Sequence, residues 1–232
     1  MTDLNRHKFL LVQILKDIYS DLGLSGCLGF KGGTALMLFH DLPRFSVDLD
    51  FNLLCPGKEA ETNEKVRGIL TRYGTIFDEA AKFHGLLLVL NYGKGERKLK
   101  IEISNRKYDD HYEMRDFLGI NVRVMLKPDM FAHKLYALLD RKPVARRDLF
   151  DCWYFMSART PVNRGIVESR TGMPLTEYLQ ECINRLEPAG DRWLLQGMGE
   201  LMDDEMKKFV RTKLRTESIG LMKLYREFPI YS

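Results

Sequence analysis

The feature of the sequence that most limits its fold is a glycine turn that leads into a short apolar helix. Gly32 and Gly33 precede Thr34 and the run Ala-Leu-Met-Leu-Phe, which predicts a tight turn and then a helix over residues 34–40. We expect Thr34 to cap this helix, so that free backbone N–H groups point outward from the turn. Such a helix start favours a phosphate, and residues 32–34 are therefore predicted to form a phosphate cradle.

Two aspartates follow the turn in a pattern typical of a strand. Asp48 and Asp50 alternate with Val47, Leu49 and Phe51, and a period of two places both carboxylates on one face and the apolar side chains on the other. Carboxylates held this close repel each other unless a cation lies between them, and such oxygen ligands suit Mg²⁺ or Mn²⁺. A phosphate cradle beside this metal site indicates phosphoryl or nucleotidyl transfer. The alternative interpretation is a solvated strand face or a capping pair in a loop.

Length and composition are those of a globular protein. The 232 residues suffice for one large domain or two small ones, and the net charge of +4 permits a nucleotide or RNA partner without requiring one. The sequence has no signal-type hydrophobic block and no apolar run of membrane-spanning length, so we expect a cytoplasmic protein without a membrane partner. The cysteines are scattered and are expected to be reduced thiols: Cys27, Cys55, Cys152 and Cys182.

Helical and strand patterns alternate in the first part of the chain, whereas the last part has helical patterns alone. Helices are predicted over residues 4–22, 34–40, 58–84 and 128–140, and strands over the aspartate segment and residues 27–31, 86–92, 98–104 and 121–126. Strands 86–92 and 98–104 are expected to form a hairpin. Further helices are predicted over 148–157, 163–169, 175–185, 192–198 and 203–228. The expected fold class is α/β (α+β), with an α/β domain over residues 1–145 and a helical region over 146–232.

Two blocks of residues, taken together, have a familiar form. The first is Gly-Gly-Thr-Ala-Leu followed by Arg-x-Ser-x-Asp-Leu-Asp-Phe, and the second is Lys-Leu-Tyr-Ala-Leu at 134–138, Arg141, and Arg-Asp-Leu-Phe-Asp at 147–151. In this order they resemble the AbiEii/AbiGii-type toxins, a branch of the nucleotidyltransferase superfamily that includes DNA polymerase β-like enzymes. The resemblance covers residues 31–153 and implies a nucleotidyltransferase-like mixed sheet flanked by helices.

The resemblance also implies a set of metal ligands. Asp48 and Asp50 would hold two divalent ions, and a third carboxylate on a neighbouring strand would help to hold the catalytic metal and accept the proton of the nucleophile. Glu102 is the best match, because it lies on the polar face of the alternating strand 98–104. A surface glutamate paired with a neighbouring lysine is the alternative.

Other residues are expected to contact the nucleotide or the acceptor. By resemblance, Lys134 binds phosphates and acts in the catalytic site with Asp148, which can orient the acceptor, hold Lys134 or cap the following helix. Arg147 and Asp151 are secondary candidates. The full set expected to bind nucleotide is Gly32, Gly33, Thr34, Arg44, Ser46 and Lys134.

The resemblance implies a metal-dependent nucleotidyltransferase that transfers a nucleoside monophosphate from an NTP to an acceptor. It also implies the toxin of an abortive-infection or toxin–antitoxin pair, with tRNA as the favoured acceptor and an antitoxin as partner. Two alternatives remain: transfer to a protein or small-molecule hydroxyl, and a catalytically inactive nucleotide-binding module.

Overall fold

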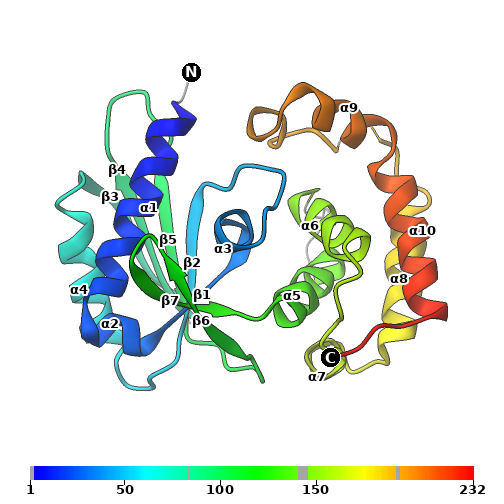
Figure 1. Ribbon diagram of the computed structural model, residues 1–232, viewed down its shortest axis with the longest axis horizontal. Coiled ribbons are helices and arrows are strands. Elements are labelled where there is room, and N and C mark those ends of the chain that lie inside the picture. Colours follow the sequence, from blue (N-terminus) through cyan, green and yellow to red (C-terminus); the bar gives the residue numbers. More distant parts are fainter. Residues whose placement is uncertain (1–2, 83, 141–145, 192–193) are drawn as a thin grey trace. The chain divides into compact units, whose positions relative to one another are not determined.

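The computed structural model describes residues 3–82, 84–140, 146–191 and 194–232, and its chain forms two compact units (Figure 1). The first unit comprises Met1–Asp41, Ser46–Lys107 and Tyr112–Met125. The second comprises Leu42–Phe45, Tyr108–His111 and Leu126–Ser232. The expected domain boundary at residue 145 lies outside the described residues and stays a prediction.

The first unit is a mixed seven-stranded sheet with helices packed on it, which confirms the predicted α/β fold class. The sheet order is β3-β4-β5-β2-β1-β7-β6, and the β2–β5 and β1–β7 pairs are parallel. The helices are α1 (Leu4–Ser20), α2 (Leu22–Cys27), α3 (Gly32–Phe39) and α4 (Glu59–Leu70). The strands are β1 (Leu28–Lys31), β2 (Asp48–Leu53), β3 (Thr75–Lys82), β4 (Gly85–Asn91), β5 (Leu99–Ser104), β6 (Tyr112–Phe117) and β7 (Ile120–Met125).

The core of this unit follows from the alternation in its central strands. On β2, Leu49 and Phe51 are fully buried, and the Tyr19 ring of α1 lies 6.4 Å from the Phe51 ring. The α1 helix begins after Asp3, whose side chain accepts hydrogen bonds from two backbone N–H groups of the first turn. Its apolar stripe packs on β2 and β7, while α4 packs on β3 and β4. The hairpin predicted from residues 86–104 is confirmed as the antiparallel pair β4–β5.

Two predictions for the sheet were wrong. The helix expected over 58–84 ends at Leu70, and residues 75–82 form β3, which pairs with β4 along its length. Ala, Glu and Lys in this segment favour a helix locally, but the tertiary pairing overrides that preference. The connection expected over 105–118 contains β6, an edge strand whose exposed charged side chains conceal the alternation.

The expectation of four reduced cysteines was also wrong. Cys27 and Cys55 form a disulfide with their Cα atoms 5.1 Å apart. They meet because β1 and β2 are antiparallel neighbours with Leu28 opposite Leu53, so the residues flanking this pair lie at the same end. Cys152 and Cys182 are free and buried.

The second unit is helical in the part of the chain that the structure describes. Its helices are α5 (Lys127–Asp140), α6 (Arg146–Ser157), α7 (Arg164–Thr171), α8 (Leu175–Leu186), the short 3₁₀ helix η1 (Gly199–Leu201), α9 (Asp204–Thr212) and α10 (Leu214–Glu227). The single helix expected over 203–228 is two helices, and residues 194–198 of the helix expected over 192–198 form turns, while 192 and 193 lie outside the described residues. The stacked rings of Phe131 and Phe155, 5.0 Å apart, lie in the core of this unit.

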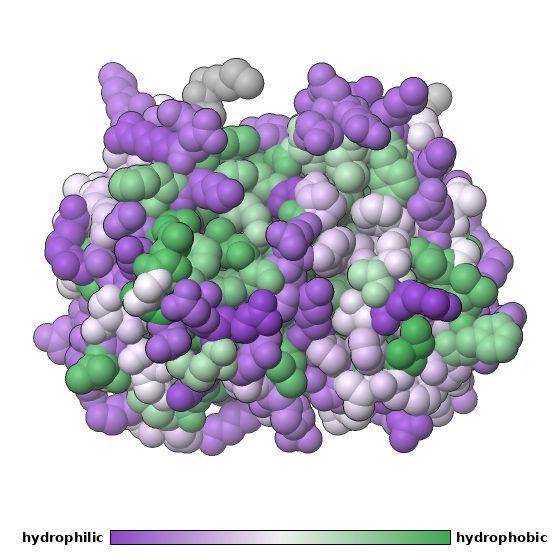
Figure 2. All heavy atoms as spheres, in the orientation of Figure 1, coloured by the Kyte–Doolittle hydropathy of each residue, from purple (hydrophilic) through white to green (hydrophobic). Residues whose placement is uncertain are grey.

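Hydrophilic side chains cover most of the face shown in Figure 2, with apolar side chains exposed between them. Among the described residues, no helix has both the length and the apolar character needed to cross a membrane.

Candidate functional site

Three carboxylates lie on one face of two neighbouring strands in the first unit. Asp50 on β2 is opposite Glu102 on the parallel strand β5, and Asp48 lies two residues earlier on the same face. Neighbouring strands are about 4.8 Å apart, so these side chains project within reach of one another. Asp48 and Asp50 are partly buried and Glu102 is exposed. The three acids, distant in sequence, therefore share one surface.

The glycine turn is in direct contact with this surface. Gly32 begins α3 with a positive φ of 81°, and a Cβ atom at this position would lie 3.0 Å from Asp50 Cβ and 3.1 Å from Asp50 Cγ, and would collide with the Asp50 carboxylate. A side chain is excluded here both by the backbone conformation and by the space that Asp50 occupies. The turn and the metal-ligand candidate are thus packed together, while the role of Gly32 and Gly33 in phosphate binding stays a prediction.

The expected capping role of Thr34 was wrong. The N-cap of α3 is Lys31, and Thr34 lies inside the helix with its hydroxyl donating a hydrogen bond of 2.5 Å to the backbone oxygen of Asp48. The pairing of β1 with β2 ends at Lys31 and Asp50, so the Thr34 hydroxyl bonds the backbone of β2 just beyond the paired residues. Ser46 is buried, and its backbone N–H points to Met37 Sδ at 3.4 Å. Contact of Thr34 or Ser46 with a nucleotide stays a prediction.

Lysines share the face with the acids. Lys31 on β1 is opposite Asp50, and Lys100 on β5 is opposite Asp48. Cross-strand pairs of opposite charge stabilise a sheet. These lysines offset part of the repulsion between the carboxylates, and any bound cation would have to compete with them.

The donor set on this face suits a hard divalent cation, since three carboxylates from two adjacent strands can supply its oxygen ligands. In their present conformations, however, no three His, Cys, Asp or Glu side chains within the described ranges converge closely enough to hold an ion. The backbone positions fit a metal site, and the carboxylates would have to rotate towards one another to form it.

A second group of charged side chains, here called the buried charge cluster, lies in the second unit and consists of Arg44, Lys134, Asp148 and Asp151. Arg44 donates two hydrogen bonds of 2.7 Å, from Nε and one terminal nitrogen, to the two carboxylate oxygens of Asp151. The two side chains are 2% and 0% exposed. Lys134 Nζ lies 2.9 Å from Asp148 Oδ1 and 2.8 Å from Asp151 Oδ2.

Charge pairing dominates the proton equilibria of this cluster. Burial alone would raise the pKa of Asp151, but Arg44 and Lys134 lower it below its ordinary value. Burial alone would lower the pKa of Lys134, but Asp148 and Asp151 raise it. Asp151 and Lys134 are therefore both charged at neutral pH, and the ion pair between them is intact.

The structure shows one of the three roles considered for Asp148, the contact with Lys134. Its side chain lies in the first turn of α6 and holds Lys134. Arg147 is exposed, and Arg141 lies outside the described residues. The expected contacts of Arg44 and Lys134 with nucleotide phosphates, and the catalytic roles of Lys134 and Asp148, stay predictions.

One residue that bears directly on the site was not predicted from the sequence. His7 of α1 is fully buried and lies 2.9 Å, through Nε2, from the backbone oxygen of Val47, the residue before Asp48. Its position was available from the sequence, because His7 precedes Leu11 and Ile14 at helical spacing and so lies on the buried stripe of α1.

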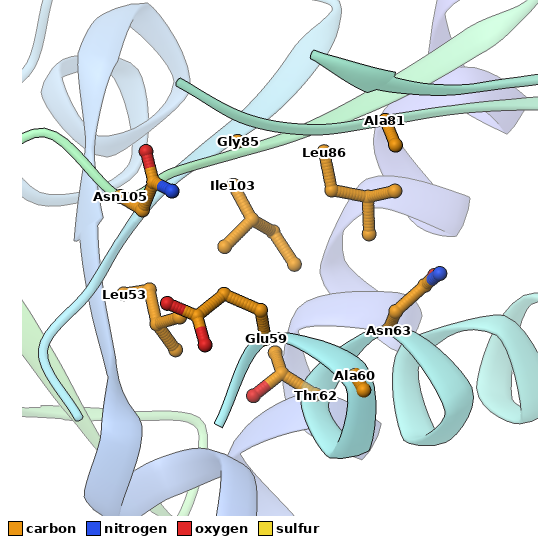
Figure 3. Close-up of a pocket in the computed structure, with 10 residues that line it drawn as sticks. All are labelled: Leu53, Glu59, Ala60, Thr62, Asn63, Ala81, Gly85, Leu86, Ile103 and Asn105. Atoms are coloured by element: carbon orange, nitrogen blue, oxygen red, sulfur yellow. The ribbon is translucent and has the colours of Figure 1, made fainter. Parts of the chain in front are cut away.

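A cavity of about 260 Å³ lies between α4 and strands β3–β5 (Figure 3). Its walls include Leu53 and Ile103, which belong to the apolar face of the sheet, opposite Asp50 and Glu102. The described residues that line it include no Lys or Arg. The cavity is therefore separate from the carboxylate face.

Comparison with known families decides the class of the protein. The sequence model of the family described as nucleotidyl transferase AbiEii toxin, type IV TA system, matches residues 13–181, well over half of the chain. The protein belongs to the AbiEii toxin family. This confirms the resemblance inferred from the two sequence blocks.

Solved structures support the fold of this AbiEii family member. A protein from H. pylori that is described as a nucleotidyltransferase matches with a TM-score of 0.63 and 20% identity, covering 99% of this chain and 97% of the other. JHP933 from Helicobacter pylori matches with a TM-score of 0.62 and 20% identity over 99% and 94% of the two chains. An antigenic nucleotidyltransferase-like protein from Paracoccidioides brasiliensis gives a TM-score of 0.50 and 13% identity, covering 82% of this chain and 92% of the other. No curated protein gives a significant match.

Family membership supports a nucleotidyltransferase that belongs to a toxin–antitoxin system, and such a system implies an antitoxin partner. Nucleotidyltransferases of this superfamily generally use a divalent metal.

Proposed function

We propose that this protein transfers a nucleoside monophosphate from an NTP to a hydroxyl group of tRNA. The hydroxyl oxygen bonds to the α-phosphorus, the bond between that phosphorus and the α–β bridging oxygen breaks, and pyrophosphate leaves. The observation that carries the proposal is the contact between the glycine turn at Gly32 and the face that bears Asp48, Asp50 and Glu102. Nucleotidyl transfer needs a turn that binds phosphates and an acidic face that binds metal, and the adjoining glycine turn and carboxylates are proposed to be these two parts.

Each residue of the acidic face has a proposed role. Asp48, Asp50 and Glu102 hold Mg²⁺ or Mn²⁺, and Glu102, the most exposed of the three, accepts the proton of the attacking hydroxyl. The metal, when bound, supplies positive charge to the triphosphate. Gly32 and Gly33, the first residues of α3, offer backbone N–H groups to the phosphates.

The choice of tRNA rests on family resemblance and on the mildly basic charge of +4. We further propose that the protein acts as a toxin in the cytoplasm and that an antitoxin neutralises it. The contribution of the second unit is proposed to come from Lys134 and Asp148, held in the buried charge cluster.

The test uses radiolabelled NTPs, purified protein, Mg²⁺ or Mn²⁺, and total tRNA. Label at the α-phosphate should appear in RNA and label at the γ-phosphate should not, because the β- and γ-phosphates leave together. Asp48→Asn and Gly32→Ala should reduce labelling to background. Asp116→Asn, an exposed aspartate on the edge strand β6, is the matched control and should label as the wild type does.

The product that carries the label identifies the acceptor. Label in a protein band or in a small product, with none in RNA, would replace tRNA by another acceptor. Transfer of γ-label would indicate phosphoryl transfer instead and would contradict the proposal.

A specific observation favours a second candidate, an inactive nucleotide-binding module. Lys31 and Lys100 stand opposite Asp50 and Asp48, so the acids can be neutralised without a metal. NTP binding that is unchanged by EDTA, together with no labelling of any acceptor, would support this candidate.

A further inference from the structure

The backbone on both sides of Asp48 is held by side chains from two helices. The carbonyl of Val47 belongs to the peptide group before the Asp48 Cα, and the carbonyl of Asp48 belongs to the peptide group after it. His7 Nε2 of α1 contacts the first oxygen at 2.9 Å, and the Thr34 hydroxyl of α3 contacts the second at 2.5 Å. Both helices belong to the first unit.

The chemistry of these contacts assigns the hydrogens on His7. A carbonyl oxygen can only accept, so Nε2 carries the hydrogen and donates it to Val47. In the neutral ring Nδ1 is then an acceptor, and the Tyr92 hydroxyl, 2.7 Å away, donates to it. Tyr92 directly follows β4, so a residue at the end of this strand selects the tautomer in which His7 donates to Val47.

Burial favours the neutral ring that this arrangement uses. His7 is 0% exposed, and burial is the largest influence that lowers its pKa. Arg97 lowers the pKa further, while the Val47 hydrogen bond and the nearby Asp48 and Glu96 oppose the change.

Peptide groups are planar, so fixing the planes before and after a Cα atom fixes its two backbone dihedrals and the direction of its Cα–Cβ bond. We propose that His7 is a positioning residue for Asp48, because together with Thr34 it sets the direction in which the Asp48 carboxylate leaves β2. This inference deepens the proposed function, on which it rests, since a metal ligand must be aimed as well as present.

The test compares two amide replacements of similar polarity. The side-chain amide of His7→Gln can place its N–H near the position of Nε2, whereas that of His7→Asn is one methylene shorter and reaches only the position of Nδ1. Binding of Mn²⁺ alone is measured by electron paramagnetic resonance, after circular dichroism has shown each variant to be folded. We expect His7→Asn to bind Mn²⁺ roughly 10-fold or more weakly, as is typical when a group supporting a metal ligand is lost. His7→Gln should retain most of the wild-type affinity.

The outcomes separate this inference from the proposed function. If Asp48→Asn binds Mn²⁺ as the wild type does, the proposed assignment of Asp48 as a metal ligand is wrong. If Asp48→Asn loses binding while His7→Asn and His7→Gln both match the wild type, or both weaken equally, the positioning role of His7 is overturned. Should His7→Asn not fold, nitrogen-15 NMR of histidine-labelled wild-type protein decides: a hydrogen on Nδ1 instead of Nε2 would overturn the inference.

Discussion

The disulfide between Cys27 and Cys55 should contribute strongly to the stability of the first unit. The bond joins residues 28 apart in sequence, and the ring it closes contains Gly32, Asp48 and Asp50. On the chain-entropy model, a closed loop of this length stabilises the folded state by about 3.6 kcal/mol. Reduction should therefore lower the free energy of unfolding by that amount, which corresponds to a urea midpoint lower by about 1.2–3.6 M.

The assay is urea unfolding followed by circular dichroism, with and without a phosphine reductant. A double variant, Cys27→Ser with Cys55→Ser, is the control, and the reductant should not change its midpoint. Thiol counting in urea provides an independent measure: Cys152 and Cys182 are free, so the untreated protein should react at those two positions and the reduced protein at all four. Four reactive thiols before reduction, or a wild-type midpoint that the reductant does not move, would refute the reasoning.

Two further predictions concern buried charges. Asp151→Asn removes the charge that Arg44 and Lys134 share, and it should lower the free energy of unfolding by about 3–5 kcal/mol in urea unfolding. The control is Glu61→Gln, which removes an exposed ion pair with Lys58 and should leave the urea midpoint nearly unchanged. Burial lowers the pKa of His7, so below about pH 6.5 the unfolded chain takes up a proton that the folded chain does not. As the pH decreases through this range, the free energy of unfolding should decrease by at most about 1.4 kcal/mol per pH unit. His7→Gln should show a shallower acid dependence in the same urea assay, and an equal slope would contradict this assignment.

The parts of the fold that the sequence predicted are those encoded by local periodicity. Alternation over β2 and β5 placed Leu49 and Ile101 inside and Asp50 and Glu102 on the other face, because a strand has one periodicity and one buried side. The helical pattern of α1 was equally direct. These elements suffice to bring the three acids onto one surface once β2 and β5 are neighbours.

The parts that failed depend on partners distant in sequence. Segment 75–82 has no strong strand pattern of its own and becomes β3 by pairing with β4. The disulfide depends on the antiparallel pairing of β1 and β2, and four scattered cysteines do not reveal it. Thr34 has the residue type of a helix cap, yet its hydroxyl is used by Asp48, 14 positions later. Residue type indicates what a side chain can do, and the fold decides which of its options is used.

The charge balance of the acidic face links the fold to the choice between enzyme and inactive module. Asp48, Asp50 and Glu102 would destabilise one another if they stood alone, and Lys31 and Lys100, placed opposite the two aspartates, reduce that cost in the folded protein. Charge pairing with these lysines does not need a fixed backbone at Asp48, because long, flexible lysine side chains adapt to a carboxylate in many positions. It therefore gives no reason for a buried histidine and a threonine to hold both peptide groups around Asp48. A metal ion, in contrast, requires its oxygen ligands at defined distances and angles. The rigid support of Asp48 therefore favours a metal-binding role over simple charge pairing.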